Sequence, residues 1–310
     1  MSALICGSMA YDTIMVFHDK FKHHILPEKT HMLNVSFLVP TMRREFGGCA
    51  GNIAYNLKLL NAEPLIMATV GHDFEPYAQW LNQYKISSQF IRTVDNQYTG
   101  QAYITTDEDD NQITAFHPGA MNFSHLNSVP ADANIRIGIV SPDGKEGMQL
   151  HAKQFSELKI PFIFDPGQGM PMFNGAELLT LVEQATWLTL NDYESELMQE
   201  RTGLSLAQLA EKVDALIVTQ GGEGSTIYTK GNEIKIPAAP VENLADPTGC
   251  GDAYRAGLLY GLLNNLDWEI TGRIASLMGA IKIEQHGTQN HTFNLDSFKQ
   301  RYQESFGTTF

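Results

Sequence analysis

The chain has 310 residues, of which 43% are hydrophobic and 18% are charged, and its formal net charge is −14. This composition is typical of a globular protein with a sizeable core, and the acidic balance argues against a general nucleic-acid-binding surface. The N-terminal residues lack the pattern of a signal peptide, and no run of 18 apolar residues occurs, so we expect a cytoplasmic protein without a membrane span. Cys6, Cys49 and Cys250 have no metal-ligand spacing and are expected to be reduced thiols.

The N-terminal part of the chain mixes buried and exposed strand patterns. An apolar run over residues 3–6 predicts a buried strand that leads into a loop. The Gly-rich segment 47–52 opens a predicted helix, and residues 65–70 are expected to form the next strand. Residues 99–116 alternate like two strands around an acidic turn, which predicts a hairpin.

From about residue 135 the chain alternates regularly between strands and amphipathic helices. The predicted strands of this part are residues 135–140, 161–164, 186–190 and 216–219. A hairpin near residues 227–236 and two helices follow. Such alternation indicates a mostly parallel sheet with right-handed crossovers.

These elements together predict an α/β fold with a doubly wound, mostly parallel sheet flanked by helices, plus a small β-sheet lid. The body is expected to comprise residues 1–12, 46–94 and 118–310, and the lid residues 13–45 and 95–117. We expect the lid over the carboxyl ends of the body strands, because ligands bind in that crevice of open α/β sheets.

The strongest chemical signal is Thr248-Gly249-Cys250-Gly251-Asp252, directly before a predicted helix. Glycines at a helix start let backbone N–H groups turn toward an anion, and the helix dipole favours negative charge there. Asp252, in the first helical turn, could orient a hydroxyl and accept its proton during phosphoryl transfer. An ordinary Gly-rich helix cap is an equally good interpretation of the loop alone. No Walker-A lysine follows, so this is not the usual P-loop.

Four further motifs are each compatible with a cap or turn as well as with a ligand site. Gly48 and Asn52 begin the first helix, where the backbone is open to a ligand. Asp12, just past the first strand, could bind a vicinal diol. Residues 191–194 (Asn-Asp-Tyr-Glu) could hold a hydrated Mg²⁺, and residues 219–224 carry glycines at another strand end.

In this order, the motifs resemble those of the ribokinase-like (PfkB) carbohydrate and nucleoside kinase family, from Gly7 to about Gln289. The family signature Asp-Thr-x-Gly-Ala-Gly-Asp is similar to residues 246–252, with Pro247 in place of Thr and Cys250 in place of Ala. Within the family, the chain most resembles the mycobacterial type of adenosine kinase. That resemblance includes Leu26-Pro27-Glu28, Phe116-His-Pro-Gly-Ala-Met121, Asp165-Pro-x-Gln168, Asp252-Ala-x-Arg-Ala-Gly257 and Gly287-Thr-Gln289.

The resemblance implies a ribokinase-like fold and transfer of the γ-phosphoryl group of ATP to the 5′-hydroxyl of adenosine, which gives AMP in purine salvage. Asp252 would be the base, and Gly249, Cys250 and Gly251 would form the anion hole. The substrate would bind at Ser8, Asp12, Ser36, Gly48, Asn52, Phe116 and Gln168. ATP would bind at Asn191, Thr219, Gly221 and Gly224, and Mg²⁺ at Asn191 and, through water, at Glu194.

Several alternatives stay open at this point. Ala102 stands where the mycobacterial type has a second lid phenylalanine, so a kinase for another nucleoside or for a sugar such as ribose is possible. A catalytically silent nucleoside-binding protein is disfavoured by Asp252. Some family members use a monovalent cation such as K⁺, which the sequence does not decide. The absence of Gly-x-Gly-x-x-Gly after the first strand excludes a Rossmann dehydrogenase.

The expected partners are a small-molecule nucleoside and ATP, with no nucleic acid and no membrane. The lid could be an edge that pairs with a second subunit, since exposed strand edges tend to be covered. The resemblance also favours a homodimer.

Overall fold

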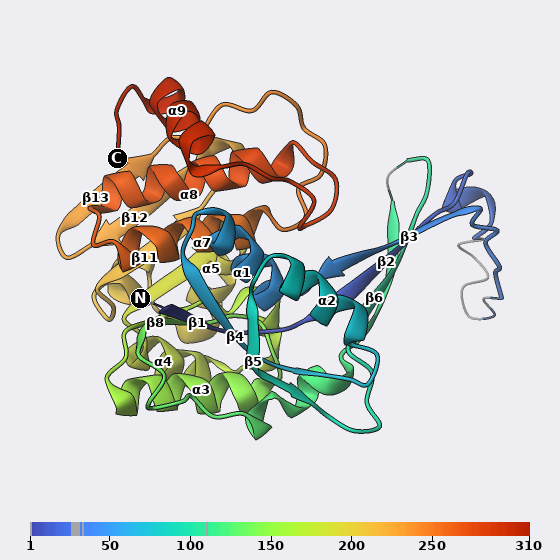
Figure 1. Cartoon of the computed structure of the whole chain (residues 1–310), viewed down its shortest axis with the longest axis horizontal. Helices are drawn as coiled ribbons and strands as arrows, with labels where there is room; N and C mark the ends of the chain where they lie inside the picture. The colour runs from blue at the N-terminus through green and yellow to red at the C-terminus, as the bar shows by residue number, and fades with distance from the viewer. Residues whose placement is uncertain (1, 26–31, 33, 110) are drawn as a thin grey trace.

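A large sheet with the strand order β13-β12-β11-β10-β9-β8-β1-β4-β5 forms the centre of the computed structural model, which describes residues 2–25, 32, 34–109 and 111–310 (Figure 1). Its strands are β1 (Ser2–Cys6), β4 (Glu63–Val70), β5 (Ser87–Thr93), β8 (Ile135–Val140), β9 (Phe162–Phe164), β10 (Trp187–Asn191), β11 (Ala215–Thr219), β12 (Ser225–Thr229) and β13 (Asn232–Ile236). From β5 to β11 neighbouring strands are parallel, and β12 and β13 add an antiparallel hairpin. The predicted parallel sheet is confirmed.

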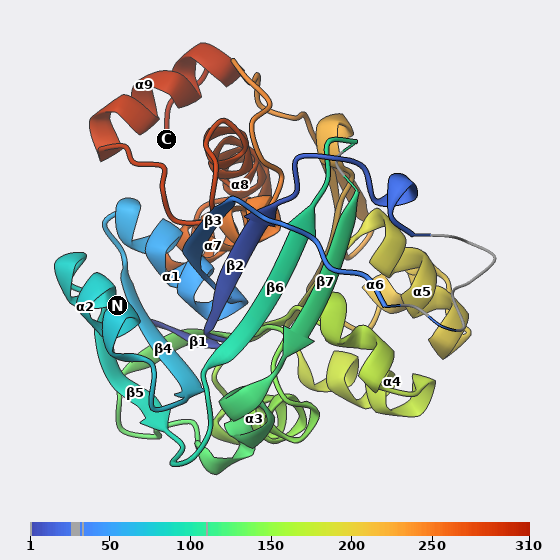
Figure 2. The same ribbon diagram turned by 90° about the vertical axis from the view of Figure 1, so that its right-hand side faces the viewer.

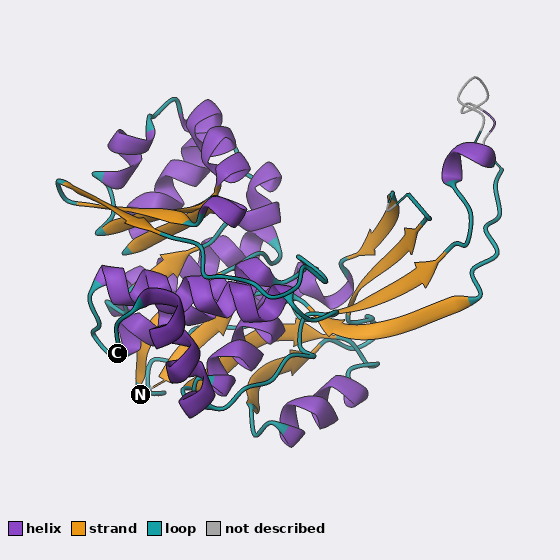
Figure 3. Ribbon diagram, turned by 90° about the horizontal axis from the view of Figure 1, so that it is seen from above, coloured by secondary structure: helices purple, strands orange, loops and turns teal. Residues whose placement is uncertain are grey.

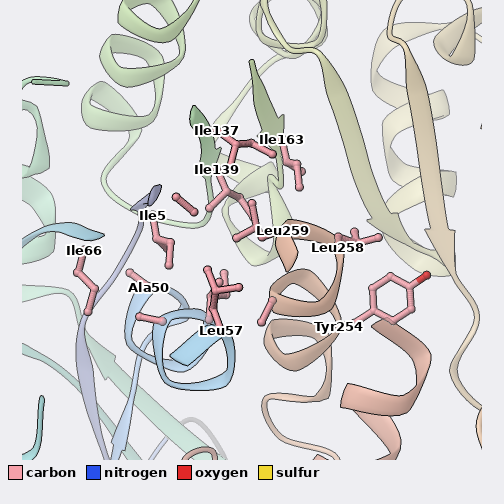
Figure 4. Close-up of a cluster of buried hydrophobic side chains, with 14 of the residues drawn as sticks. Ile5, Ala50, Leu57, Ile66, Ile137, Ile139, Ile163, Tyr254, Leu258 and Leu259 are labelled. Atoms are coloured by element: carbon pink, nitrogen blue, oxygen red, sulfur yellow. The ribbon is translucent and has the colours of Figure 1, made fainter. Parts of the chain in front are cut away.

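Helices cover both faces of this sheet because its strands carry apolar side chains on both faces. Ala3 and Ile5 of β1 point into one core, whereas Leu4 and Cys6 point into another. The first core is covered by α1 (Cys49–Leu59), α2 (Glu75–Gln83), α7 (Cys250–Leu263) and α8 (Trp268–Ile283). The second is covered by α3 (Lys145–Leu158), α4 (Gly175–Gln184), α5 (Asp192–Thr202) and α6 (Leu206–Ala210). Figure 4 shows α1 and α7 side by side, with Leu57 and Leu259 between them.

At the C-terminal end, α9 (Leu295–Phe306) packs on α8 through a smaller apolar cluster that includes Phe298 and Tyr302. Among the described residues, no helix has the length and apolar character needed to span a bilayer.

A separate four-stranded sheet, here called the lid sheet, projects from the body (Figures 1 and 3). Its strand order is β3-β2-β6-β7, and the strands are β2 (Ala10–Val16), β3 (Thr41–Gly47), β6 (Gly100–Thr106) and β7 (Gln112–His117). Figure 2 shows these strands side by side. The hairpin predicted over residues 99–116 is confirmed as β6 and β7. β2 and β3 each extend a few residues into the ranges predicted for the body, and residues 26–28 lie outside the described chain.

The chain leaves the large sheet and enters the lid sheet within three residues, 7–9, between β1 and β2. β1 lies between β4 and β8, so the strand order reverses direction there. In open α/β sheets a crevice forms at such a reversal, outside the carboxyl ends of the strands. The residues just after β1 and β8 therefore border the expected ligand crevice.

Candidate active site

The first turn of α7 combines a glycine-rich backbone with a carboxylate. Gly249 is the N-cap and has a φ of 81°, which glycine adopts without strain. The preceding turn is held by Asp246, whose carboxylate accepts hydrogen bonds from the backbone N–H groups of Thr248 and Gly287, at 2.9 Å each. N–H groups in a first helical turn have no carbonyl partner within the helix and lie at the positive end of its dipole, so this turn can bind an anion.

Asp252 lies in this turn and contacts α1. Its Oδ2 accepts a hydrogen bond from Nδ2 of Asn52 at 2.8 Å. Burial raises the pKa of Asp252 to about 7, and the hydrogen bond from Asn52 opposes this rise. A carboxylate with such a pKa can take a proton from a hydroxyl near neutral pH. The residues predicted as the base and as part of the sugar pocket are therefore in direct contact.

Arg255, one turn further along α7, is buried in an ion cluster. Its Nε and Nη2 lie 3.2 and 3.0 Å from Oδ1 of Asp165, and Nη2 lies 4.0 Å from Oε2 of Glu194. Desolvation opposes the charge of Arg255, but the two carboxylates outweigh it and raise its pKa. Sequence motifs predicted no role for Asp165 or Arg255, although an arginine within the apolar run of α7 is a signal of a buried ion pair. The cluster joins α7 to the end of β9 and to the first turn of α5.

Asn191 and Glu194 form a capping box at the start of α5. Oδ1 of Asn191 accepts from the N–H of Glu194 at 2.7 Å, and Oε2 of Glu194 accepts from the N–H of Asn191 at 2.8 Å. Asn191 is paired with Thr219 across β10 and β11. Beyond Thr219, Gly221 and Gly224 have φ values of 55° and 92°, and a Cβ at Gly224 would collide with the backbone of β13. The residues predicted for the ATP site thus lie at the ends of two adjacent strands.

Gly48 lets α1 begin against the loop that follows β1. Its φ is 87°, and a Cβ there would lie within 2.7 Å of the backbone of that loop. Ser8 is buried in the same loop, and its Oγ accepts a hydrogen bond from the N–H of Cys49 at 3.2 Å. A Cβ at Gly47 would lie 2.4 Å from Oδ2 of Asp12, so the Asp12 carboxylate covers this glycine. The structure therefore brings Ser8, Asp12 and Gly48 together.

The lid sheet places Asp12, Ala102 and Phe116 in one line across three strands. Asp12 on β2 is paired with Ala102 on β6, which is paired with Phe116 on β7. Directly paired residues project from the same face of a sheet. Phe116 is 50% exposed, so its ring is accessible on the face that carries Asp12. Burial, together with the charges of Glu45 and Asp246, raises the pKa of Asp12 to about 6.

Ser36 and Gln168 stand apart from this group. Ser36 is exposed in the segment before β3, and Gln168 is exposed in η4 (Gly167–Met172). Within the part of the chain that the structure describes, no hydrogen bond or ion pair joins either side chain to the other predicted site residues. Their roles stay predictions.

Two buried residues beyond the predicted set contact the site. Gln289, in the loop after α8, donates from Nε2 to Oδ1 of Asn52 at 2.9 Å. The ammonium group of Lys282, a fully buried residue near the end of α8, donates to the backbone oxygens of Asp246 and Gln285 at 2.7 and 3.1 Å. The turn before Gly249 is thus tied to α8. A lysine in the apolar end of α8 is a sequence signal, whereas Gln289 has none beyond the family resemblance.

The acidic residues of the site suit a magnesium ion that is bound through water molecules. In the described part of the chain, no group of three or more His, Cys, Asp or Glu side chains is placed to hold an ion alone. Mg²⁺ in phosphate-transfer sites usually takes one or two carboxylates, and waters and substrate phosphates complete its shell. Glu194, whose side chain is 13% exposed in the first turn of α5, suits that role.

Comparison with known proteins identifies the family of this chain. The model of the pfkB family of carbohydrate kinases matches residues 9–294. The chain belongs to this family. The matched range of the kinase includes both the lid sheet and the first turn of α7.

Several similar proteins are nucleoside kinases. The nucleoside kinase of Burkholderia thailandensis, solved in complex with inosine, is 48% identical, with 99% of each chain covered and a TM-score of 0.90. A nucleoside kinase of Methanocaldococcus jannaschii is 33% identical over 278 residues, which are 88% of this kinase and 91% of that protein. Ribokinase of Arabidopsis thaliana, solved with ribose and ATP, covers 97% of this chain and 98% of its own, with 18% identity and a TM-score of 0.77, and supports the fold alone. The predicted ribokinase-like fold is confirmed.

Proposed function

We propose that this kinase transfers the γ-phosphoryl group of ATP to the 5′-hydroxyl of a nucleoside, with adenosine preferred and AMP as the product, a reaction of purine salvage. The contact between Asp252 and Asn52 carries the proposal. It holds a carboxylate with a pKa of about 7 in the first turn of α7. A base at this position is next to backbone N–H groups that can stabilise a phosphoryl group in transfer.

In the proposed reaction, Asp252 accepts the proton of the 5′-hydroxyl as the hydroxyl oxygen attacks the γ-phosphorus and the bond from that phosphorus to the leaving ADP breaks. The backbone of residues 249–251 would surround the phosphoryl group and stabilise its charge. Burial raises the pKa of Cys250 to about 11, so this thiol stays neutral and adds no negative charge at the anion hole. Arg255 is held by Asp165 and would keep α7 in place.

Mg²⁺ would neutralise charge on the phosphates of ATP. Glu194 would hold it through water, beside Asn191, and Thr219, Gly221 and Gly224 would line the rest of the ATP site. The pairing of Asn191 with Thr219 supports this arrangement, because it places both at one edge of the sheet.

On the acceptor side, Asp12 would bind the ribose hydroxyls, and Phe116 would pack on the base from the same face of the lid sheet. Gly48, Ser8 and Ser36 would complete the pocket, and Gln168 would pair with the edge of the base. Inosine is the second candidate, because the similar kinase of Burkholderia thailandensis was solved with it. A glutamine amide can both donate and accept, so it can pair with the 6-amino group of adenosine or the 6-oxo group of inosine.

The direct test compares ATP consumption with adenosine, inosine, guanosine, ribose and fructose in the presence of Mg²⁺. We expect the highest kcat/KM for adenosine and much lower values for both free sugars. Phe116→Ala should lower kcat/KM for nucleosides about tenfold and leave the low rate with ribose unchanged, because only the base loses its stacking partner. A preference for a free sugar would contradict the nucleoside proposal, and a higher value for inosine would contradict only the choice of adenosine.

We also propose that two copies of the kinase associate through the lid sheet. A row of three apolar residues and one threonine crosses the face opposite Asp12, since Met42, Met15, Thr105 and Ile113 are paired in succession from β3 to β7. Met42 is 67% and Ile113 44% exposed, so the row lacks cover within one copy at both edge strands. Such a face favours a partner surface. Sedimentation equilibrium should give a dimer for the parent and a monomer for Met42→Lys/Ile113→Lys, and a monomeric parent would refute the proposal.

A further inference from the structure

A chain of hydrogen bonds extends from Asp252 into the interior of the body. Nδ2 of Asn52 donates to Asp252, and Oδ1 of Asn52 accepts from Nε2 of Gln289 at 2.9 Å. Asn52 is 4% and Gln289 2% exposed. Water therefore has little access to this chain, and each amide depends on its protein partners for its orientation.

One member of this hydrogen-bond chain, Trp80, fixes the direction of the other hydrogen bonds. An indole N–H can only donate, and Nε1 of Trp80 donates to Oε1 of Gln289 at 2.8 Å. Nε2 of Gln289 must then face the opposite side, where it meets Asn52 and, at 2.6 Å, the hydroxyl of Tyr77. This hydroxyl donates its own proton to the backbone oxygen of Gly47 at 2.9 Å, so it accepts from Gln289.

The neighbouring glycine makes the hydroxyl contact possible. A Cβ at Gly51 would lie 2.0 Å from the hydroxyl oxygen of Tyr77. Gly51, the last glycine of the motif at residues 47–52, therefore leaves room for the hydrogen-bond chain.

Because its carbonyl oxygen is taken by Gln289, Asn52 has only its amide N–H group to offer to Asp252. We propose that Gln289 is a positioning residue for phosphoryl transfer, which orients the amide of Asn52 so that an N–H donor and not a carbonyl oxygen faces the catalytic base. This inference rests on the proposed function of Asp252 as that base. With the opposite orientation, the carbonyl oxygen of Asn52 would require a protonated Asp252, which could not accept a proton from the hydroxyl.

Of the other groups around Asp252, the hydroxyl of Tyr77 accepts a hydrogen bond from Gln289, whereas in the described part of the chain Asp165, Arg255, Cys49 and Cys250 have no hydrogen bond to it. Burial raises the pKa of Asp252, and the charge of Asp165 also raises it. The charge of Arg255 and a hydrogen bond from Cys49 lower it. The hydroxyl of Tyr77 and the thiol of Cys250 have raised pKa values and are neutral near pH 7. Asn52 is hydrogen-bonded to both Gln289 and Asp252, so a change at Gln289 acts on Asp252 mainly through Asn52.

The test compares the pH dependence of kcat in three variants. Gln289→Met removes the donor at similar size, and Gln289→Glu replaces the donor by acceptors only, which favours the reversed orientation of Asn52. We expect the midpoint of the acidic limb to rise by about half a unit or more in Gln289→Met and further in Gln289→Glu, with kcat at pH 7 lowered about tenfold and the KM for ATP nearly unchanged. Asn290→Met, an exposed neighbour in the same loop, should leave the profile unchanged.

A second measurement separates this inference from the proposed function. The pKa of the Asp252 carboxyl, followed by carbon NMR and assigned with Asp252→Asn, should rise in Gln289→Met even if no tested nucleoside is phosphorylated. An unchanged carboxyl pKa in folded Gln289→Met would overturn the inference while leaving the kinase assignment intact. If Gln289→Met does not fold, Trp80→Phe removes the orienting N–H and keeps an aromatic ring at this position, and a shift in the same direction supports the inference whereas no shift overturns it.

Discussion

Asn52 and Asp252 are 200 positions apart in the chain, and the amide nitrogen of the first lies 2.8 Å from the carboxylate of the second. One residue is on α1 and the other on α7, so their contact depends on how these helices pack on the sheet. Leu57 of α1 and Leu259 of α7 belong to the same core cluster (Figure 4). The apolar core therefore sets the distance between the proposed base and its amide partner.

The raised pKa of Asp252 predicts a pH-dependent rate. Below a pH of about 7 the carboxyl is mostly protonated and cannot accept the proton of the hydroxyl, so kcat should rise with pH and level off above this value. Steady-state assays from pH 5.5 to 8.5 with saturating ATP and Mg²⁺ check this. Asp252→Asn should lose at least about a hundredfold in kcat at every pH and keep nucleoside binding in calorimetry. A flat profile for the parent would show that Asp252 is not the base.

Replacement of Arg255 should destabilise the fold. Arg255→Met would leave the buried carboxylate of Asp165 without its main partner, and breaking a buried pair in this way costs about 3–5 kcal/mol. The double variant Arg255→Met/Asp165→Asn should recover part of that loss, because the unpaired charge is gone. Urea unfolding measures both values. Equal stabilities of the single variant and the parent would contradict a structural role of the ion pair.

The crossing of α7 and α8 should be sensitive to a single methyl group. A Cβ at Gly257 would lie 2.4 Å from the Cα of Ala275, so Gly257→Ala should lower the free energy of unfolding by about 1–3 kcal/mol. Gly279→Ala is the matched control in α8, since the nearest atom to its Cβ would be 3.7 Å away. This control should be neutral or up to about 1 kcal/mol more stable, because alanine favours helix. The opposite order of stabilities would refute the close approach.

The buried ammonium group of Lys282 should matter for the rate. Lys282→Met would leave the backbone oxygen of Asp246 without its charged donor and loosen the turn before Gly249, so kcat should fall about tenfold or more. Lys235→Met, at a side chain that is 82% exposed, is the control and should behave like the parent.

Because Lys282 already supplies a monovalent positive charge beside this turn, the parent should turn over equally well in KCl and NaCl. A strong requirement for K⁺ would contradict this explanation.

The fold was largely predictable because its signals are local. The strands β8 to β11 are short apolar runs between amphipathic helices, and this alternation alone indicates a parallel sheet. β5 escaped prediction because Ser87–Thr93 is an edge strand with mostly polar, partly exposed residues. The apolar residues within positions 34–39 form no strand in the structure, and the strand follows at Thr41–Gly47.

The places of Asp252 and of the capping pair Asn191 and Glu194 at helix starts were predictable, because glycines before a helix and an Asn at its N-cap are local signals of a helix start. Their roles in catalysis and binding stay predictions. The contacts of Trp80 and Gln289 could not be predicted, because a hydrogen bond between side chains 209 positions apart leaves no periodic pattern in the sequence. Their relation exists only after α2 and the loop following α8 have been packed against α1.

The three-residue connection between β1 and β2 has a consequence for which acceptors the kinase can use. Asp12 is carried by the lid sheet, whereas Asp252 is carried by the body, and residues 7–9 are the short link between β1 and β2. With the roles proposed for these two carboxylates, an acceptor would have to reach from the lid sheet to the body, with a diol at one end and a reactive hydroxyl at the other. Water is too small to do this. The separation of the two sheets would then select acceptors that are long enough to reach from Asp12 to Asp252.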